Sequence, residues 1–441
     1  MKRLLAAVVT GIVSFFLVAH AHAATAVEVV AAPVTGSDDI RNYGAVCNST
    51  SSQAANNTAI ANALAAQGSA YIPACTIYVS NASLGSGQRI WGGGYSSNLV
   101  AYGTLSATGL INCAGCSGAS VDHVNISVNG TQRTAGVSGI TCSGCANTSV
   151  TYNTVQGNYG IEVLGSVNST VNFNNVTAYG EASGTNGSGS GIAIQGTALD
   201  SHGYPCGGTP SVNGTVIGNN VSGAVTPGST GSAPTPIGIN ICGANSIVVS
   251  QNVLNGPGYF GIALRGNNSF KNVVSANIVN LSVHEGIINA GGASFNVIDS
   301  NAISAGANSR DYCLTLDGTQ GTVTMASVKN NNLYQCCLTG ITVAHAVTQS
   351  SIVGNSIVNP NTCGSNAQAG IVVYGPEANF NQVSSNTIIA GSPTLGYGIL
   401  EQTDGGYPSG NVYMSNSEVS MTSGSFNLQS GSTGNNNITY P

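Results

Sequence analysis

The sequence has little charge, and basic residues are its scarcest component. Only 5% of the 441 residues are charged, with 9 Lys and Arg against 15 Asp and Glu. Removal of an N-terminal segment holding Lys2 and Arg3 leaves 7 basic residues and a net charge of −8. Because phosphate binding requires a basic face, this balance argues against nucleic acid as a partner.

Long apolar runs are also scarce, and the longest lies at the N-terminus. A basic start is followed by an apolar stretch over residues 4–18 and by Ala-His-Ala at 21–23, which is typical of a signal peptide with its cleavage site. Neither this stretch nor a later one reaches the roughly 20 apolar residues of a membrane span. We therefore predict a signal peptide over residues 1–23, a flexible leader over 24–37, and a secreted protein, periplasmic or extracellular, without a membrane partner.

Glycine and small polar residues dominate what remains, around an ample apolar content. Hydrophobic residues make up 42% of the chain, and 60 residues are Gly. Disordered chains are usually poor in apolar residues and rich in charge, so this chain is expected to fold. A surface of Asn, Ser, Thr and Gly suits a β-solenoid, in which successive turns stack their polar side chains.

Two residue columns repeat at the spacing of one β-helix coil. A Gly-aliphatic pair or its equivalent recurs, mostly every 21 to 31 residues, at Gly109-Leu110, Gly139-Ile140, Gly160-Ile161, Gly191-Ile192, Gly238-Ile239, Gly261-Ile262, Gly286-Ile287, Cys313-Leu314, Gly340-Ile341, Gly370-Ile371 and Gly398-Ile399. An asparagine column runs beside it at Asn153, Asn175, Asn220, Asn252, Asn277, Asn301, Asn332, Asn355, Asn386 and Asn416. Stacked Asn side chains satisfy backbone groups at tight turns. The repeat predicts an all-β fold, a right-handed single-stranded parallel β-helix.

The segment before the repeats has the features of an N-terminal cap. A short strand is expected over residues 39–45, followed by a helix that Asn57 or Thr58 caps and Gly68 ends. Two strands are expected next, over 70–73 and 76–79. A short capping helix would cover the open end of a solenoid. We assign residues 38–87 to the cap and first strands and 88–441 to the coils of the same domain.

A series of short motifs runs through this cap in a fixed order. It comprises Tyr43-Gly44-Ala45, Asn57-Thr58-Ala59-Ile60, Gly68, Tyr71-Ile72-Pro73, Tyr78 and Ile90-Trp91-Gly92-Gly93-Gly94. This order, over about 60 residues, resembles the N-terminal cap and first coil of the pectate-lyase-like superfamily, which includes polygalacturonases, polysaccharide lyases and phage tailspikes. The chain departs from the family pattern at Cys47-Asn48, Asn56-Asn57 and Ala74. The resemblance implies the parallel β-helix and a polysaccharide partner, but it carries over no catalytic residue.

The 12 cysteines favour disulfides, because the chain is expected to be exported. Cys113-x-x-Cys116 and Cys142-x-x-Cys145 occupy matching places in successive repeats. Such doubled pairs also occur in zinc sites, although export favours disulfides here. Further disulfides are expected between Cys47 and Cys75, and among Cys313, Cys336, Cys337 and Cys363.

Charged residues gather between Tyr259 and Asp317, where seven occur and the mean composition predicts about three. The position of each candidate site residue within its coil assigns it to one of two edges of a single sheet. The residues that precede their strands are His284, Glu285, Arg310 and Asp311. Those that follow their strands are Arg265, Asp317, His345 and Tyr374. Outside this region Asp122-His123 and Glu401 with Asp404 are expected at the surface.

Glu285 and Asp311 are the candidate catalytic residues of a hydrolase. Neighbouring coils stack about 4.8 Å apart, so carboxylates one coil apart fall near the roughly 5–9.5 Å separation that glycoside hydrolysis requires. His284 and Arg310 beside them would bind sugar hydroxyls or uronate oxygens and shift the carboxylate pKa values.

A polysaccharide lyase would use the same region differently. It requires a base that removes the proton α to a uronate carboxylate and cations that neutralise that carboxylate. The main candidates for these roles would be Arg265, Arg310, His284, His345 and Tyr374. The motifs of family polygalacturonases do not occur in the coils, and no acidic cluster comparable to the calcium site of pectate lyases is present. No metal or other cofactor is therefore predicted, and calcium in particular lacks support.

The favoured hypothesis is a secreted polysaccharide-cleaving enzyme. A hydrolase is slightly favoured over a lyase, because the net negative charge of the chain does not favour binding to a strongly anionic polymer. The alternative is a non-catalytic exported β-helix that binds glycans or forms part of a surface layer. In that case Arg265 with Asp317, and Arg310 with Glu285 or Asp311, would be surface ion pairs that hold coils in register.

Overall fold

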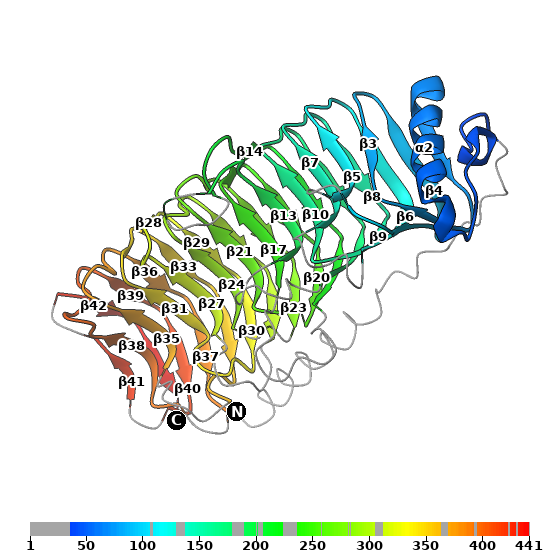
Figure 1. The fold of residues 1–441 in the computed structure, drawn as a ribbon. Coiled ribbons are helices and arrows are strands. Elements are labelled where there is room, and N and C mark those ends of the chain that lie inside the picture. The colour runs from blue at the N-terminus through cyan, green and yellow to red at the C-terminus, as the bar shows by residue number, and fades with distance from the viewer. Residues whose placement is uncertain are drawn as a thin grey trace. The chain divides into compact units, whose positions relative to one another are not determined.

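The computed structural model describes residues 36–105, 109–128, 137–178, 189–199, 201, 206–223, 236–256, 258–280, 282, 284–304, 312–362, 369–391, 395–421, 424–428 and 431–440. The chain from Thr35 to Pro441 forms one compact unit. Within it, short strands stack coil upon coil from the N-terminal helix to the C-terminal strands (Figure 1).

The cap consists of two 3-10 helices and one α-helix before the first strands. They are η2 (Ile40–Tyr43), η3 (Thr50–Ser52) and α2 (Gln53–Gln67). The strand expected over residues 39–45 is wrong, because Asp39 caps a 3-10 turn by accepting a 2.9 Å hydrogen bond from the Arg41 amide. The predicted helix is confirmed but begins a turn earlier, and its predicted end at Gly68 (φ 71°) is confirmed.

Thirteen parallel strands, called here the first sheet, form one wall of the coils. They are β3 (Ala82–Leu84), β5 (Gly109–Ala114), β7 (Ser138–Ser143), β10 (Tyr159–Leu164), β13 (Ser190–Gln195), β17 (Ile237–Cys242), β21 (Phe260–Arg265), β24 (Glu285–Ala290), β27 (Tyr312–Asp317), β31 (Ile341–Ala344), β35 (Ala369–Tyr374), β38 (Tyr397–Gln402) and β41 (Gly424–Asn427).

The other two walls are parallel ladders that share the long strands β4 and β6 and therefore count as one 26-stranded sheet. One ladder contains β1 (Ser69–Ile72), β4 (Arg89–Ala101), β6 (Ser120–Ser127), β8 (Ser149–Thr151), β11 (Thr170–Asn172), β15 (Thr215–Ile217), β19 (Val248–Ser250), β22 (Val273–Ser275), β25 (Val297–Asp299), β29 (Ser327–Lys329), β33 (Ser351–Val353), β36 (Gln382–Ser384), β39 (Val412–Met414) and β42 (Thr433–Asn435). The other adds β2 (Thr76–Val79), β9 (Thr154–Gly157), β12 (Asn175–Ala178), β16 (Asn220–Gly223), β20 (Val253–Asn255), β23 (Ile278–Asn280), β26 (Ala302–Ser304), β30 (Asn332–Tyr334), β34 (Ser356–Val358), β37 (Thr387–Ile389), β40 (Ser417–Val419) and β43 (Ile438–Tyr440). Two short pairs lie at turns: β14 (Ser211–Val212) with β18 (Ala244–Asn245), and β28 (Val323–Thr324) with β32 (Val347–Thr348).

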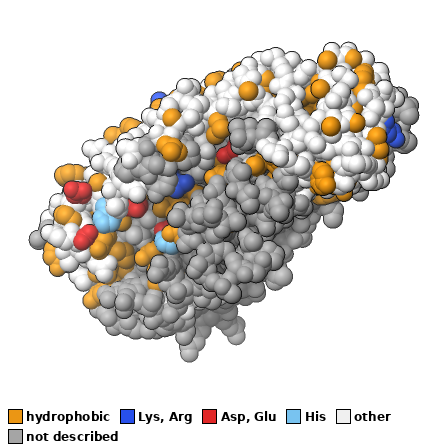
Figure 2. Space-filling model, viewed as in Figure 1, with side chains coloured by type: hydrophobic (Ala, Val, Ile, Leu, Met, Phe, Trp, Pro, Cys, Tyr) orange, Lys and Arg blue, Asp and Glu red, His pale blue; other side chains and the backbone are white. Residues whose placement is uncertain are grey.

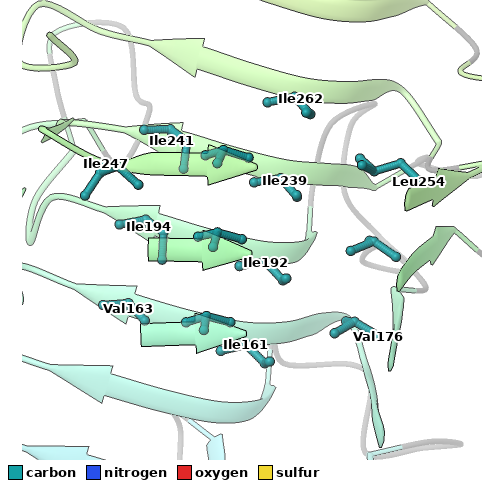
Figure 3. Packing of buried hydrophobic residues seen from close by; sticks show 14 of the residues in the cluster. Ile161, Val163, Val176, Ile192, Ile194, Ile239, Ile241, Ile247, Leu254 and Ile262 are labelled. Carbon is teal, nitrogen blue, oxygen red and sulfur yellow. The ribbon is translucent and has the colours of Figure 1, made fainter. Parts of the chain in front are cut away.

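Aliphatic rows fill the interior between the three walls. Ile161, Ile192, Ile239 and Ile262 are register partners on successive strands of the first sheet, and all are fully buried. Figure 3 shows these side chains stacked above one another beside the Val163–Ile194–Ile241 row. Full burial of each such side chain contributes about 1.5–3 kcal/mol, so the repeated rows supply most of the driving force for folding.

The glycine column marks the corner where the first sheet begins. A Cβ added at Gly261 would lie 2.4 Å from Val279 Cγ1 and 2.3 Å from the Gly286 carbonyl oxygen. Glycine is therefore required because the backbone approaches another wall and the next coil. The predicted column is in phase except at Gly109-Leu110, where the register pairs Gly109 with Ser138 instead of Gly139.

A buried asparagine ladder occupies the turn between the second and third walls. Its members are Asn153, Asn174, Asn219, Asn252, Asn277, Asn301, Asn331, Asn355, Asn386, Asn416 and Asn437, each joined to the next by a backbone N–H to side-chain oxygen hydrogen bond. The residue before each Asn lies at a left-handed turn, as at Ser300 (φ 56°). The predicted column is confirmed, but Asn175, Asn220 and Asn332 are one residue out of phase.

Disulfides stabilise both the cap and the coils. The predicted Cys47–Cys75 bond is present, and Cys313 pairs with Cys336 within the predicted set. Cys206 pairs with Cys242, and Cys337 is also disulfide-bonded. No helix among the described residues is long and apolar enough to cross a membrane.

Candidate functional site

The outer face of the first sheet carries the predicted site residues. Register pairs Arg265 with Ala290, Ala290 with Asp317, Asp317 with Ala344, and Ala344 with Tyr374. Arg265, Asp317 and Tyr374 therefore share one row at the strand ends, whereas His345, which was predicted with them, follows this row by one residue. Strand β24, which carries Ala290 in this row, lies between the strands of Arg265 and Asp317. An ion pair between Arg265 and Asp317 would therefore have to span two strand spacings, about 10 Å.

His284 and Glu285 form a contact at the opposite end of these strands. Glu285 is the first residue of β24 and is 5% exposed, and His284 Nδ1 lies within hydrogen-bonding distance of Glu285 Oε2. The Tyr259 ring packs 4.7 Å from the His284 ring, and the Phe260 ring lies 5.9 Å away edge-on. The imidazole is thus oriented by a carboxylate on one side and by aromatic rings on another.

Tyr312 connects the two strand ends electrostatically. It is the register partner of Glu285 on the next strand, β27. Burial raises the pKa of Tyr312, and the nearby Glu285 and Tyr374 raise it further. Burial also raises the pKa of Glu285, with a smaller increase from Asp317, while the His284 hydrogen bond opposes the rise. The two predicted edges therefore form one electrostatically connected surface.

Two threonine hydroxyls lie in the middle of this surface. Thr315 and Thr342 are register partners on β27 and β31, and Thr315 is 6% exposed. Neither hydroxyl oxygen has a hydrogen-bond partner within the described parts of the chain, although both atoms are buried. A buried hydroxyl without a partner costs free energy.

The edge at the ends of the strands, which carries Arg265 and Asp317, is more exposed than the edge that carries Glu285. Arg265 donates a 3.3 Å hydrogen bond to Asn240 Oδ1, and Asp317 accepts one of 2.9 Å from the Thr319 amide. His345 follows β31 in a left-handed conformation (φ 60°) and stands edge-on to the Tyr374 ring at 5.3 Å. Its Nδ1 lies 3.6 Å from Asp404 Oδ2.

Arg310 and Asp311 lie outside the described residues. The predicted spacing between Glu285 and Asp311, and the ion pair of Arg310 with either carboxylate, therefore stay predictions. The structure instead adds Tyr312, Thr315 and Thr342 to the site. Strand alternation could have placed Thr315 and Thr342 on the outer face, since they alternate with buried inward residues. Alternation would have placed Tyr312 inward with Leu314, so its position could not have been found in this way.

Apolar clusters flank the polar surface on both sides. One consists of Ile237, Phe260, Ala263 and Ile288, packed with Tyr259 and Ala290. The other consists of Ala369, Val372 and Leu400, packed with Tyr374 and Tyr397. In Figure 2 most of the visible acidic and histidine side chains lie toward the end of the molecule that holds the C-terminal strands.

Two residues expected at the surface are buried. Glu401 is 1% exposed and points inward, where its Oε1 accepts hydrogen bonds of 2.7 Å from the Tyr413 hydroxyl and from Ser432 Oγ. Asp122 is 8% exposed and forms a two-point contact with Arg89, with both N–O distances 2.6 Å. The surface prediction is wrong for both because hydrogen bonds compensate their burial. No group of three or more His, Cys, Asp or Glu among the described residues could hold a metal ion.

Comparison with known proteins identifies the fold. No family model matches the sequence, and no curated protein matches it. Among solved structures, the A-module of a mannuronan C-5 epimerase from Azotobacter vinelandii is similar with a TM-score of 0.61 and 16% identity, covering 91% of this chain and 99% of that one. The chain has a right-handed parallel β-helix fold.

Two further parallel β-helix structures show how widely this fold is used. Tailspike protein 3 of bacteriophage CBA120 is similar with a TM-score of 0.61 and 11% identity, over 91% of this chain and 62% of that one. A surface protein and adhesin of Streptococcus pneumoniae has a TM-score of 0.56 and 14% identity, over 90% and 99%. The resemblance inferred from the cap is therefore confirmed as a fold. At these identities the similarity establishes the fold alone.

Proposed function

We propose that the protein is an exported enzyme that acts on a uronate-containing polysaccharide by abstracting the proton α to the uronate carboxylate. The observation that carries this proposal is the contact of His284 with the buried Glu285 on the outer face of the first sheet. A proton on Nδ1 that is donated to the carboxylate leaves Nε2 as the proton acceptor. Glu285 is then a positioning residue, and His284 is the base.

Tyr312 supplies the second proton-transfer group. Its pKa is raised by burial and by Glu285, so the phenol stays protonated at neutral pH and acts as an acid. The proton leaves carbon for His284 Nε2, and the electron pair moves onto the uronate carboxylate. Tyr312 then protonates either the opposite face of that carbon, giving an epimer, or the departing glycosidic oxygen, giving an unsaturated product.

The remaining residues bind the substrate. Arg265, which is partly exposed at the end of β21, offers a cation for a uronate carboxylate. Tyr374 borders the apolar cluster at the other side and offers a ring face to a sugar. The structural relative described as a mannuronan C-5 epimerase acts on a polymer of this class.

Proton abstraction is favoured over the hydrolase expected from the sequence for a structural reason. Hydrolysis requires two nearby carboxylates. Among the described strands of the first sheet from β17 to β38, the outward carboxylates are Glu285 and Asp317, which lie at opposite ends of adjacent strands. Glu285 is engaged by His284, and its predicted partner Asp311 lies outside the described residues.

One assay separates the possible reactions. The purified protein is incubated in D₂O with polymannuronate, polyguluronate and a neutral polysaccharide. Deuterium at C5, detected by NMR, marks epimerisation, and absorbance of an unsaturated uronate marks elimination. New reducing ends without either signal would indicate a hydrolase, and binding without any product would indicate the non-catalytic alternative; either outcome overturns the proposal.

Variants test the residue roles. His284→Ala and Tyr312→Phe are each expected to lower kcat by about 10²- to 10⁴-fold. Glu285→Gln keeps an oxygen acceptor for Nδ1 but removes the charge, so its loss should be smaller and should change the pH profile. His123→Ala is the matched control, because this half-exposed histidine stacks on Tyr152 far along the chain. Equal activity in His284→Ala and His123→Ala would remove His284 from the mechanism.

A further inference from the structure

Four cysteines lie together inside the N-terminal coils, away from the outer-face site. Cys113, Cys116, Cys142 and Cys145 are each no more than 3% exposed. Cys113 and Cys142 occupy an inward row of the first sheet that Leu84 fills one coil before and Val163 one coil after. Two coils thus carry thiols where their neighbours carry aliphatic side chains.

The geometry pairs these cysteines across coils. Cys113 and Cys142 are direct register partners on the parallel strands β5 and β7. Parallel neighbours lie about 4.8 Å apart, within the roughly 4.4–6.8 Å between Cα atoms that a disulfide spans. Beyond the strands, Cys116 Sγ lies 2.8 Å from Cys145 Sγ. The two sulfur atoms are therefore in direct contact.

The surroundings favour disulfides over a metal site. No group of three or more potential ligands in the described residues could hold a metal ion. The Cys142 hydrogen bond and burial raise the pKa of Cys113, and burial raises the pKa of Cys145 to about 12. Thiolates are the species that bind zinc, and this interior disfavours them. The disulfides Cys206–Cys242 and Cys313–Cys336 in other coils are consistent with an oxidising compartment.

We propose that Cys113–Cys142 and Cys116–Cys145 form two stacked disulfides that covalently clamp successive coils of the β-helix. Each bond forms when two thiols exchange with the disulfide of a thiol–disulfide oxidoreductase. One protein disulfide forms, the oxidoreductase disulfide is reduced to two thiols, and no other reagent is consumed. Because buried thiols react slowly, the exchange takes place before these coils close.

The arrangement of basic residues makes a direct test simple. Trypsin cleavage at Arg89, Arg133 and Arg265 yields a 90–133 peptide with Cys113 and Cys116 and a 134–265 peptide with Cys142 and Cys145. The protein is exported to an oxidising compartment, purified without reductant, unfolded in iodoacetamide and digested. We expect one linked species that separates only after reduction, with all four cysteines unalkylated.

Other outcomes of this digestion would overturn the proposal. Separate peptides with unalkylated cysteines would mean bonds within each Cys-x-x-Cys motif. Separate peptides with alkylated cysteines would mean free thiols, and stoichiometric zinc by elemental analysis together with that alkylation would mean a metal site. The Cys206–Cys242 bond lies within the second peptide and reports that oxidation was preserved.

Double variants establish the pairing. Cys113→Ser with Cys142→Ser, and Cys116→Ser with Cys145→Ser, should each leave one bond and keep the two peptides linked. Cys113→Ser with Cys145→Ser removes one partner from each bond, so it should yield unlinked peptides and two alkylated thiols. A linked species in this last variant would contradict the pairing. If a variant does not fold, the digestion of the unmodified protein still decides whether the coils are clamped.

Discussion

Replacing Asn301 by alanine is expected to destabilise the β-helix strongly although no contact with the site is lost. Asn301 is fully buried in the asparagine ladder. Its Oδ1 accepts a 3.0 Å hydrogen bond from the Asn277 amide, and its Nδ2 donates one of 2.9 Å to the Val274 carbonyl. Val274 lies in strand β22 and Asn277 at the turn that follows it, and both residues are buried, so both backbone groups remain buried when the side chain is removed.

The magnitude follows from those two groups. A buried backbone donor or acceptor left without a partner costs about 1–3 kcal/mol, so Asn301→Ala should lower the free energy of unfolding by about 2–6 kcal/mol. Asn280→Ala is the matched control. Asn280 donates one hydrogen bond of 3.1 Å to Asn255 on the surface, and a surface change of this kind costs about 0.5 kcal/mol or less.

Two measurements check this expectation. Guanidinium denaturation gives the shift of the unfolding midpoint for each variant, and hydrogen exchange followed by mass spectrometry reports the protection of the peptide that contains Asn277. Asn301→Ala should show a lower midpoint and faster exchange in that peptide, whereas Asn280→Ala should show neither. Equal midpoints for the two variants would refute the view that the ladder satisfies otherwise unpaired backbone groups.

Two further predictions concern buried ionisable residues. Tyr413→Phe removes a 2.7 Å hydrogen bond to the Glu401 carboxyl and should cost about 1.5–3 kcal/mol by denaturation, whereas Tyr407→Phe, at a half-exposed residue, should cost far less; equal losses would contradict the role of the interior bond. Burial raises the pKa of Glu285 above its usual 4.5, so folding favours the protonated form of this carboxyl. Its contribution to the free energy of unfolding is therefore present below pH 4.5 and is lost as the pH rises through the folded-state pKa. Glu285→Gln should therefore be more stable than the parent at pH 7, by a margin that shrinks toward pH 4; melting temperatures measured across this range test the claim, and a margin independent of pH would disprove it.

The limits of sequence prediction are visible at particular residues. In the doublets Asn174-Asn175, Asn219-Asn220 and Asn331-Asn332 the spacing is compatible with either member of the ladder, and the first member faces inward because the next strand begins one residue later. Glu401 is in phase with an inward row, yet its charge suggested the surface. Its burial depends on Tyr413 and Ser432, which come from later segments of the chain.

The sequence by itself determined the β-helix, the glycine corner and the shared row of Arg265, Asp317 and Tyr374. This was possible because each coil contacts equivalent residues of the next coil, so a period in the sequence becomes a row in space. Only the tertiary structure decided that Glu285 contacts His284 and that Tyr312 lies within electrostatic range of both Glu285 and Tyr374. Those relations depend on side-chain direction and burial across the outer face, which the repeat period does not encode.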